Sequence, residues 1–142
     1  MKTWSEAPFP SADSLRKIDE VVPLASPDDP AMAGWFRDYS RHHRDRLAFD
    51  IDHALAHLPA GGRILEYGSV PPLFTAALAR SGYQVFGLDL APGRCADALR
   101  RLALDVAECD IEKQPVPHAD GSFDGIVFNL SLIHISEPTR PY

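Results

Sequence analysis

The stretch that decides the fold runs from residue 63 to residue 90 and reads RILEYGSVPPLFTAALARSGYQVFGLDL. Its first part, RILEYG, is an apolar strand that ends in a turn, and its last part, YQVFGLDL, is a second apolar strand. Between them, PLFTAALARSG has the composition of a helix that Gly82 ends. A strand, a helix and a strand of these lengths predict two parallel strands joined by a right-handed crossover.

The same alternation continues after residue 90. Pro92 opens a second helix, PGRCADALRRL, and a third strand is expected within ALDVAECDIE, residues 103–112. A loop that contains prolines then leads to a fourth strand in FDGIVFN, residues 123–129. Strands that alternate with helices indicate an α/β fold. We predict a Rossmann-like, doubly wound parallel sheet that is incomplete, with about four strands, and that N-terminal helices precede.

Two segments come before this sheet. Residues 1–30 are rich in proline and are expected to form an arm with one short helix over 14–22. Residues 31–62 predict a long amphipathic helix, because Asp29 can cap it, Pro30 suits its first turn, and apolar residues recur at helical spacing. Its arginines and histidines alternate with aspartates, which favours a solvated face over an anion site. Three aromatic residues near its start are expected in the core, with a cover over a ligand pocket as the alternative: Trp35, Phe36 and Tyr39.

The last segment, residues 130–142, reads LSLIHISEPTRPY and resembles the in-frame translation of a sequencing adapter. We therefore expect a non-native tail, with the natural sequence ending near Asn129 and the gene continuing beyond it. A continuation of the fourth strand is the alternative, because SLIHI is apolar. His134 lies in this segment and is not considered a catalytic candidate.

The composition is that of an ordinary globular protein and argues against several classes of function. The net charge of −6 disfavours general nucleic-acid binding, which needs an excess of Lys and Arg. No apolar run reaches the roughly 18 residues that cross a bilayer, and the N-terminus lacks the apolar core of a secretory signal, so we expect a cytoplasmic protein with no membrane partner. Cys95 and Cys109 lack the spacing of a metal site and are expected to be reduced thiols.

The acidic residues of residues 63–129 point to a ligand site. Four of them are assigned to the carboxyl ends of the predicted strands: Glu66, Asp89, Asp110 and Asp124. In an open parallel sheet, ligands bind at this edge, where the strand order reverses. Asp89 ends the second strand, where an acid can accept hydrogen bonds from both hydroxyls of a ribose, whereas Asp124 is expected to be structural. Gly68 allows a tight turn, and the helix that begins near Pro72 can offer its positive end to an anionic group.

Four successive segments carry a resemblance to a known family. ILEYGSVPP, FGLDLAP, AECDIE and FDGIVFN resemble, in order, the motifs of class I S-adenosylmethionine-dependent methyltransferases. The resemblance implies S-adenosyl-L-methionine as the cofactor and covers residues 63–129, a partial Rossmann-like cofactor-binding domain. It implies that Glu66 binds near the methionine amino group, that Gly68 and Ser69 form the loop of the first motif, and that Asp89 and Leu90 hold the ribose. It further implies that Asp110 and Ile111 contact the adenine and that Asn129 contacts the methionine end.

The resemblance also implies what lies outside these motifs. In the family, the catalytic base and the acceptor pocket follow the fourth strand or belong to added elements, so no catalytic residue is assigned and the methyl acceptor is unknown. We expect the chain as it stands to bind the cofactor weakly or not at all and to transfer no methyl group. An edge strand without a neighbour would also leave apolar residues exposed.

Two alternatives remain open from the residues alone. The family's first motif has further glycines where this chain has Val70 and Pro72, and prolines 71 and 72 remove two backbone donors. A Rossmann domain of an NAD(P)-dependent dehydrogenase is one alternative, but GSVPPL offers one of its three glycines, and Glu66 would repel a pyrophosphate. A non-catalytic Rossmann-like scaffold is the other.

Overall fold

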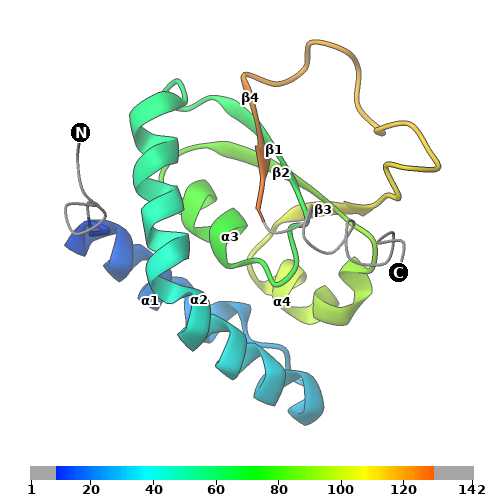
Figure 1. Cartoon of the computed structure of the whole chain (residues 1–142). Helices are drawn as coiled ribbons and strands as arrows, with labels where there is room; N and C mark the ends of the chain where they lie inside the picture. The colour runs from blue at the N-terminus through cyan, green and yellow to red at the C-terminus, as the bar shows by residue number, and fades with distance from the viewer. Residues whose placement is uncertain (1–8, 130–142) are drawn as a thin grey trace, which may run out of the picture.

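The computed structural model describes residues 9–129, so the arm before residue 9 and the predicted non-native tail of residues 130–142 lie outside the described residues. After two N-terminal helices come four strands; α3 joins the first two, η2 and α4 join the second and third, and a loop leads to the fourth, as expected (Figure 1). The elements in order are α1 (Ala12–Ala25), α2 (Pro30–His57), β1 (Arg63–Tyr67), α3 (Leu73–Arg80), β2 (Gln84–Asp89), the 3-10 helix η2 (Pro92–Cys95), α4 (Ala96–Arg101), β3 (Asp105–Glu108) and β4 (Gly125–Phe128).

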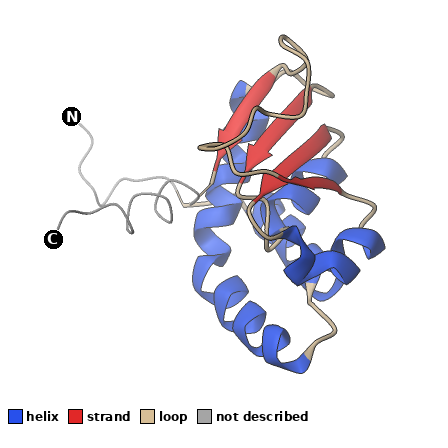
Figure 2. Ribbon diagram, turned by 90° about the vertical axis from the view of Figure 1, so that its right-hand side faces the viewer, coloured by secondary structure: helices blue, strands red, loops and turns tan. Residues whose placement is uncertain are grey.

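The four strands form one parallel sheet in the order β3-β2-β1-β4 (Figure 2). The central strand β1 pairs with both β2 and β4, and its Glu66 lies opposite Gly87 on one side and Val127 on the other. The direction in which strands are added reverses after β3, so the switch point that ligands use in open α/β sheets lies between the adjacent strands β1 and β4. The prediction of an incomplete Rossmann-like parallel sheet is therefore confirmed.

The connections between the strands explain which face each helix covers. Connections β1–α3–β2 and β2–α4–β3 proceed in one direction along the sheet, whereas the connection from β3 to β4 crosses back over β1. Because such crossovers are right-handed, the reversal moves the last connection to the opposite face. That face holds Leu65 and Leu88, and within residues 9–129 a loop covers it with Val116 and Phe123 rather than a helix.

The larger core lies on the other face, where α3 packs against the sheet and α1 and α2 pack against α3 and against each other. Fully or almost fully buried side chains from all three helices meet strand residues there: Ile18, Val21, Leu47, Ile51, Ile64, Leu73, Leu78 and Val85. The expected long helix is α2, which Asp29 caps through a hydrogen bond to the Ala31 N–H at 3.1 Å. In Figure 1 the first half of α2 extends past the carboxyl edge of the sheet, so the helix both covers the core and borders that edge.

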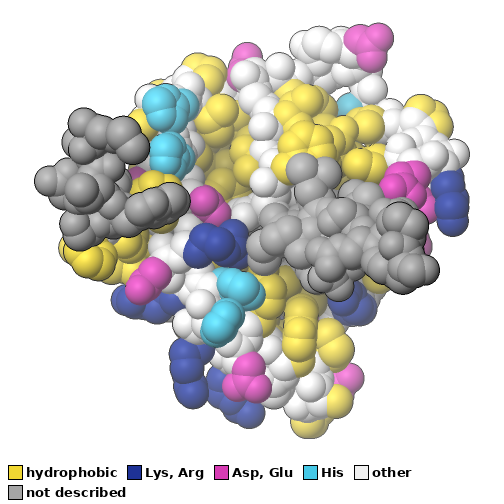
Figure 3. Space-filling model, viewed as in Figure 1, with side chains coloured by type: hydrophobic (Ala, Val, Ile, Leu, Met, Phe, Trp, Pro, Cys, Tyr) yellow, Lys and Arg dark blue, Asp and Glu magenta, His cyan; other side chains and the backbone are white. Residues whose placement is uncertain are grey.

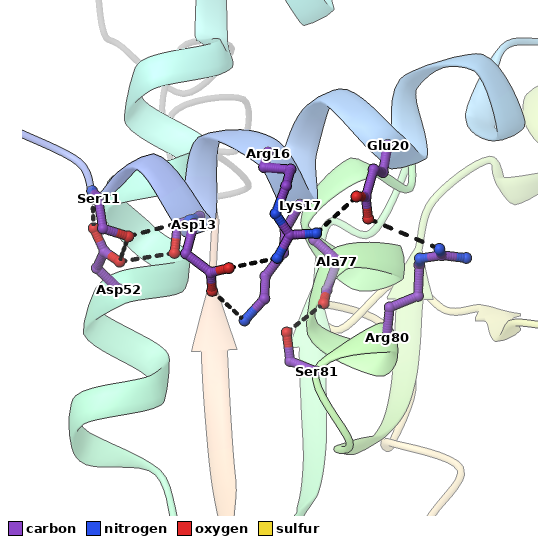
Figure 4. A network of polar contacts seen from close by, with 10 residues as sticks. Ser11, Asp13, Arg16, Lys17, Glu20, Asp52, Ala77, Arg80 and Ser81 are labelled. Carbon is purple, nitrogen blue, oxygen red and sulfur yellow. Dashed lines mark hydrogen bonds and ion pairs between the residues drawn. The ribbon is translucent and has the colours of Figure 1, made fainter.

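A polar network joins α1 to α2 and α3 (Figure 4). The carboxylate of Asp52 on α2 accepts hydrogen bonds from the Ser11 N–H at 2.7 Å, the Ser11 hydroxyl at 2.6 Å and the Ser14 hydroxyl at 2.7 Å. Ser11 is the N-cap of α1, so one carboxylate of α2 binds the unpaired end of the preceding helix. On the other side of α1, Glu20 lies 3.9 Å from Arg80 of α3.

Two further sequence expectations concern membranes and thiols. Within residues 9–129, no helix combines the length and the apolar character that crossing a membrane requires. Cys95 and Cys109 are free and buried, as expected. Burial raises the pKa of the Cys95 thiol to about 11, so this group is protonated at neutral pH.

We expect Asp52→Ala to destabilise the fold by about 1–2 kcal/mol, because it removes a side chain that binds the N-cap residue and its backbone N–H. Urea unfolding followed by circular dichroism measures this change. Asp45→Ala is the matched control, since Asp45 lies on the same helix, is mostly exposed and has only a 3.4 Å contact with Arg44. Equal stability of the two variants would contradict the assigned role of Asp52.

Candidate functional site

The strand order places four predicted site residues side by side along the carboxyl edge of the sheet. Asp110 follows β3, Asp89 ends β2, Glu66 lies near the end of β1, and Asn129 follows β4. Their order along the edge is therefore 110, 89, 66, 129, which differs from their order in the sequence.

Asp124 does not belong to this row. It precedes β4, and its carboxylate accepts the Arg63 N–H at 2.8 Å, so it joins the amino ends of two strands; its assignment to a carboxyl end is wrong, and its structural role is confirmed.

The turn after β1 is bound tightly to the end of β2. Gly68 has a φ of +76°, a conformation that favours glycine, and its N–H donates to the Leu88 carbonyl at 2.7 Å. The Ser69 N–H donates to the same carbonyl at 3.3 Å, and the Ser69 hydroxyl donates to the Glu66 carbonyl at 3.0 Å. Gly68 and Ser69 therefore form the turn that leads from β1 toward α3.

Gly87 makes this close approach possible. A Cβ at this position would overlap the Ser69 hydroxyl and would lie 2.7 Å from the Ser69 Cβ and 2.8 Å from a methyl of Val106. Ser69 and Val106 belong to other segments of the chain, so no local sequence motif predicts that they lie against Gly87. Gly87 is a residue of the site that the sequence analysis did not identify, and its signal was a glycine inside an otherwise apolar strand.

Asp89 is nearly buried, with 8% of its surface exposed, and it organises the loop backbone. One carboxylate oxygen accepts the Val70 N–H at 3.0 Å, and the other accepts the Ala91 N–H at 3.0 Å. Arg94 lies 3.6 Å from the second oxygen. A carboxylate has about four acceptor sites, so these two backbone bonds leave acceptor capacity for hydroxyl groups of a ligand. Leu90, the next residue, is largely exposed beside it.

Glu66 is a carboxyl group inside the sheet, only 1% exposed. Burial raises its pKa from the ordinary value of 4.5 to about 7, although hydrogen bonds from Thr75 and Ser69 act in the opposite direction and the charge of Asp89 adds to the rise. The Thr75 hydroxyl donates to the carboxylate. Within residues 9–129, no Lys, Arg or His forms an ion pair with Glu66. A buried carboxyl without a cation suits a ligand that brings a positive charge.

Asp110 and Ile111 lie at the start of a turn beyond β3. One Asp110 carboxylate oxygen accepts the Glu112 N–H at 3.1 Å, and the other lies 3.5 Å from the Lys113 ammonium group. The Asp110 carbonyl accepts the N–H groups of Lys113 and Gln114. These bonds hold the turn, while the side chain of Ile111 remains exposed next to it.

The start of α3 differs from the sequence expectation. Pro72 and Leu73 are fully buried, and the Thr75 hydroxyl donates its hydrogen bond to the Glu66 carboxylate. The first turn of α3 therefore lies within the core, and its positive end does not open toward a ligand at the surface. Pro71 and Pro72 explain the difference, because they lack the N–H groups that a loop uses to hold an anion.

Part of α2 also faces this edge. The sequence predicts a solvated face for its charged residues, and Arg44 fits this prediction through its exposed pair with Asp19 at 2.6 Å. Arg46 does not: its Nη1 donates to the Asn129 side-chain oxygen at 2.6 Å and lies 3.0 Å from Asp50. These three residues line one end of a cavity of about 390 Å³ between α2 and β4. In Figure 3 histidine side chains lie over α2 beside this region.

The aromatic residues at the start of α2 divide between the core and the edge. Phe36 is buried, as expected, whereas Trp35 is 38% exposed and lies under the Arg94 guanidinium, 5.9 Å from the ring centre. Tyr39 packs against Trp35 with 5.6 Å between ring centres. Burial raises the pKa of Tyr39, while the charges of Arg46 and Glu66 act on its hydroxyl with opposite sign. The stripe of Trp35, Tyr39 and Arg46 thus runs along the site.

The parallel sheet and its reversed strand order are those of a Rossmann-like domain, whose ligands bind at the carboxyl edge where the acidic row lies. Comparison with known proteins gives the family: a family described as "Methyltransferase domain" matches residues 65–141, and the chain belongs to it.

Two similar proteins are also named as methyltransferases. The chain is 30% identical over 120 residues to a demethylmenaquinone methyltransferase of Beutenbergia cavernae, which covers 77% of this chain and 49% of the relative. It is 32% identical over 94 residues to a ubiquinone biosynthesis O-methyltransferase of Xanthomonas axonopodis pv. citri, which covers 63% of this chain and 39% of the relative. The chain thus spans half or less of the length of these relatives.

We expect Gly87→Ala to destabilise the protein by about 1–3 kcal/mol, because the added methyl group overlaps Ser69 and Val106. Gly93→Ala is the control, since a Cβ at Gly93 meets no atom within 4 Å. Thermal and urea unfolding compare the two variants. Similar stabilities would show that the turn after β1 moves away from β2 at little cost.

Glu66→Gln tests the buried carboxyl through pH. The pKa of Glu66 is about 7 in the fold and 4.5 ordinarily, so the unfolded chain loses its proton first as pH rises. The wild-type fold therefore loses stability through this group from about pH 4.5 to about pH 7, by about 3 kcal/mol, and the loss stays constant above that range. We expect the variant to lack this component, so its stability relative to wild type rises over the same window. Urea titrations at several pH values that gave parallel profiles for the two proteins would refute the shifted pKa.

Proposed function

We propose that this chain is the N-terminal cofactor-binding half of an S-adenosylmethionine-dependent methyltransferase. The observation that carries the proposal is the spatial order of the polar residues along the carboxyl edge. Reading from β3 to β4, the edge presents Asp110, Asp89, Glu66 and Asn129. The cofactor has its adenine, ribose and amino-acid parts in the same linear order, so each part can meet the residue that the family resemblance implies.

The chemical character of each residue supports this assignment. Asp110 can accept the exocyclic amine of adenine, with the exposed Ile111 beside the ring. Asp89 retains acceptor capacity for ribose hydroxyls, with Leu90 adjacent. Gly68 and Ser69 bring the backbone to the edge, and Glu66 offers a buried carboxyl to the ammonium group, which would lower its pKa again. Asn129 follows β4 and would contact the methionine end.

The bound cofactor supplies a methyl group on a positively charged sulfur. The residues of this chain would hold it, orient it and exclude water from one side, because alignment and desolvation are what such a displacement needs from the protein. The stripe of Trp35, Tyr39 and Arg46 on α2 lies along the same edge and would cover the cofactor on that side. The residues of this chain assign no methyl acceptor, and a cytoplasmic location stays a prediction of the sequence.

Binding of S-adenosylhomocysteine tests the proposal directly, with amide chemical shifts followed to millimolar ligand so that weak binding is measured. The sequence left weak binding and no binding open. Because the structure brings the four polar residues together at one edge, we expect weak but saturable shifts there. Asp89→Ala and Asp110→Ala should each weaken binding by about fivefold or more, as expected when a hydrogen bond to a charged group is lost.

The control for this experiment is Asp105→Ala. Asp105 begins β3 at the amino edge of the sheet, whereas Asp110 follows its carboxyl end. The control should bind like wild type. An absence of binding to the wild-type chain at millimolar ligand, or an equal loss in Asp105→Ala and Asp110→Ala, would overturn the proposed function.

A further inference from the structure

The outer edge of β4 is a side of the sheet that the described residues leave unpaired. In the order β3-β2-β1-β4, β4 bonds to β1 only, so its other side presents backbone N–H and C=O groups to a further strand. Its sequence, GIVF, contains neither proline nor a charged residue, which are the features that protect such an edge. The strand at the opposite edge, β3, begins with Asp105 and ends with Glu108. Of the two edges, β4 is therefore the one that can accept another strand.

The side chains of β4 make this edge apolar on one face. Val127 packs into the helical core, and Ile126 and Phe128 lie on the opposite face because successive residues of a strand alternate. They are 55% and 48% exposed, and the ring centre of Phe128 lies 4.5 Å from that of Tyr67 on β1. A further strand that carries apolar side chains on the same face would bury this pair.

A second copy of this chain offers such a strand. A twofold axis perpendicular to the sheet makes the two β4 strands antiparallel and keeps the same face of both sheets on one side. With Val127 on the axis, Ile126 of each copy lies directly opposite Phe128 of the other copy. All four side chains then share the face that has no helices. This register buries both exposed residues at once, as a self-complementary interface requires.

The charges at the two ends of β4 favour the same arrangement. Asp124 precedes the strand and is exposed, whereas Arg46 is bonded to Asn129 at the opposite end. Antiparallel pairing brings Asp124 of one copy to the Asn129 end of the other, so that unlike charges approach each other. Asp50 lies 3.0 Å from Arg46 and reduces this contribution, so the apolar pairs supply the larger part.

We propose that two copies of this chain associate through antiparallel pairing of their β4 strands, with Val127 at the twofold axis. The two four-stranded sheets then form one continuous sheet. The inference does not rest on the proposed function, because the pairing of strands needs no ligand. The carboxyl edges of the two copies point in opposite directions in this arrangement, so the acidic row of each copy stays open.

Sedimentation equilibrium of the whole chain over a wide range of concentrations measures the association. We expect a reversible dimer with a dissociation constant of about 10–100 μM, as for an interface at the small end of the specific range. Ile126→Lys places a charge opposite Phe128 of the other copy and should raise this constant at least about tenfold. Leu55→Lys is the matched control and should associate like wild type, since Leu55 is also partly exposed, at 39%, but belongs to α2.

A disulfide experiment tests the register. Residues directly opposite each other in an antiparallel pair have Cα atoms about 4.5–5.5 Å apart, within the distance that a disulfide spans. Val127→Cys should therefore give a covalent dimer on mild oxidation, because position 127 lies opposite itself. Ile126→Cys is the control: position 126 lies opposite 128, so its own counterpart is two residues farther along and beyond disulfide reach. The native Cys95 and Cys109 are buried and leave the comparison clear.

The results separate this proposal from its alternatives. A chain that stays monomeric at the highest concentration, or an Ile126→Lys variant that associates like wild type, overturns the proposal; the edge of β4 would then be covered from within the chain or by a different protein. Crosslinking of Ile126→Cys as fast as Val127→Cys also overturns it, because that result indicates association without this register. Binding of S-adenosylhomocysteine tests the proposed function independently of each of these results.

Discussion

The contact between the turn after β1 and the end of β2 is the constraint on which the rest of the site depends. Gly68 and Ser69 both donate to the Leu88 carbonyl, and the absence of a side chain at Gly87 lets Ser69 lie directly against the strand. Asp89 then accepts the Val70 N–H and fixes the far side of the turn. Because the turn cannot move away from β2, the carboxyl groups of neighbouring strands are held at one level on one edge.

The same packing creates the chemistry of Glu66. Placing a carboxyl on the central strand, under a turn and beside α3, removes it from water and raises its pKa to about 7. Thr75 compensates in part by donating a hydrogen bond. A buried acid of this kind costs stability in the absence of a cation and favours the binding of one, which is a common compromise between fold and function at ligand sites.

The helix α2 connects the core to the site. Its second half packs Leu47 and Ile51 against the sheet, while Trp35, Tyr39 and Arg46 reach the carboxyl edge. Arg46 and Asn129 meet although 83 residues separate them in the sequence. On β4, hydrophobic side chains remain at the surface, with Ile126 55% and Phe128 48% exposed, and Figure 3 shows apolar side chains gathered in this region. Within the described residues, helices thus cover one face of the sheet, while the outer strand β4 leaves apolar side chains exposed.

The sequence by itself determined the parallel α/β sheet, the elements in their order, and the family, because strand and helix periodicity and the motifs of residues 63–129 are local patterns. It also identified Glu66, Gly68, Asp89 and Asp110 as candidates, since acids and glycines at strand ends have a chemical meaning without further context. Only the tertiary structure decided that Asp110 lies beyond Asp89 and Asn129 beyond Glu66, that Asp124 belongs to the opposite edge, and that Gly87 and Arg46 take part. These facts depend on which segments pack together, and packing between distant segments leaves no periodic trace in the chain.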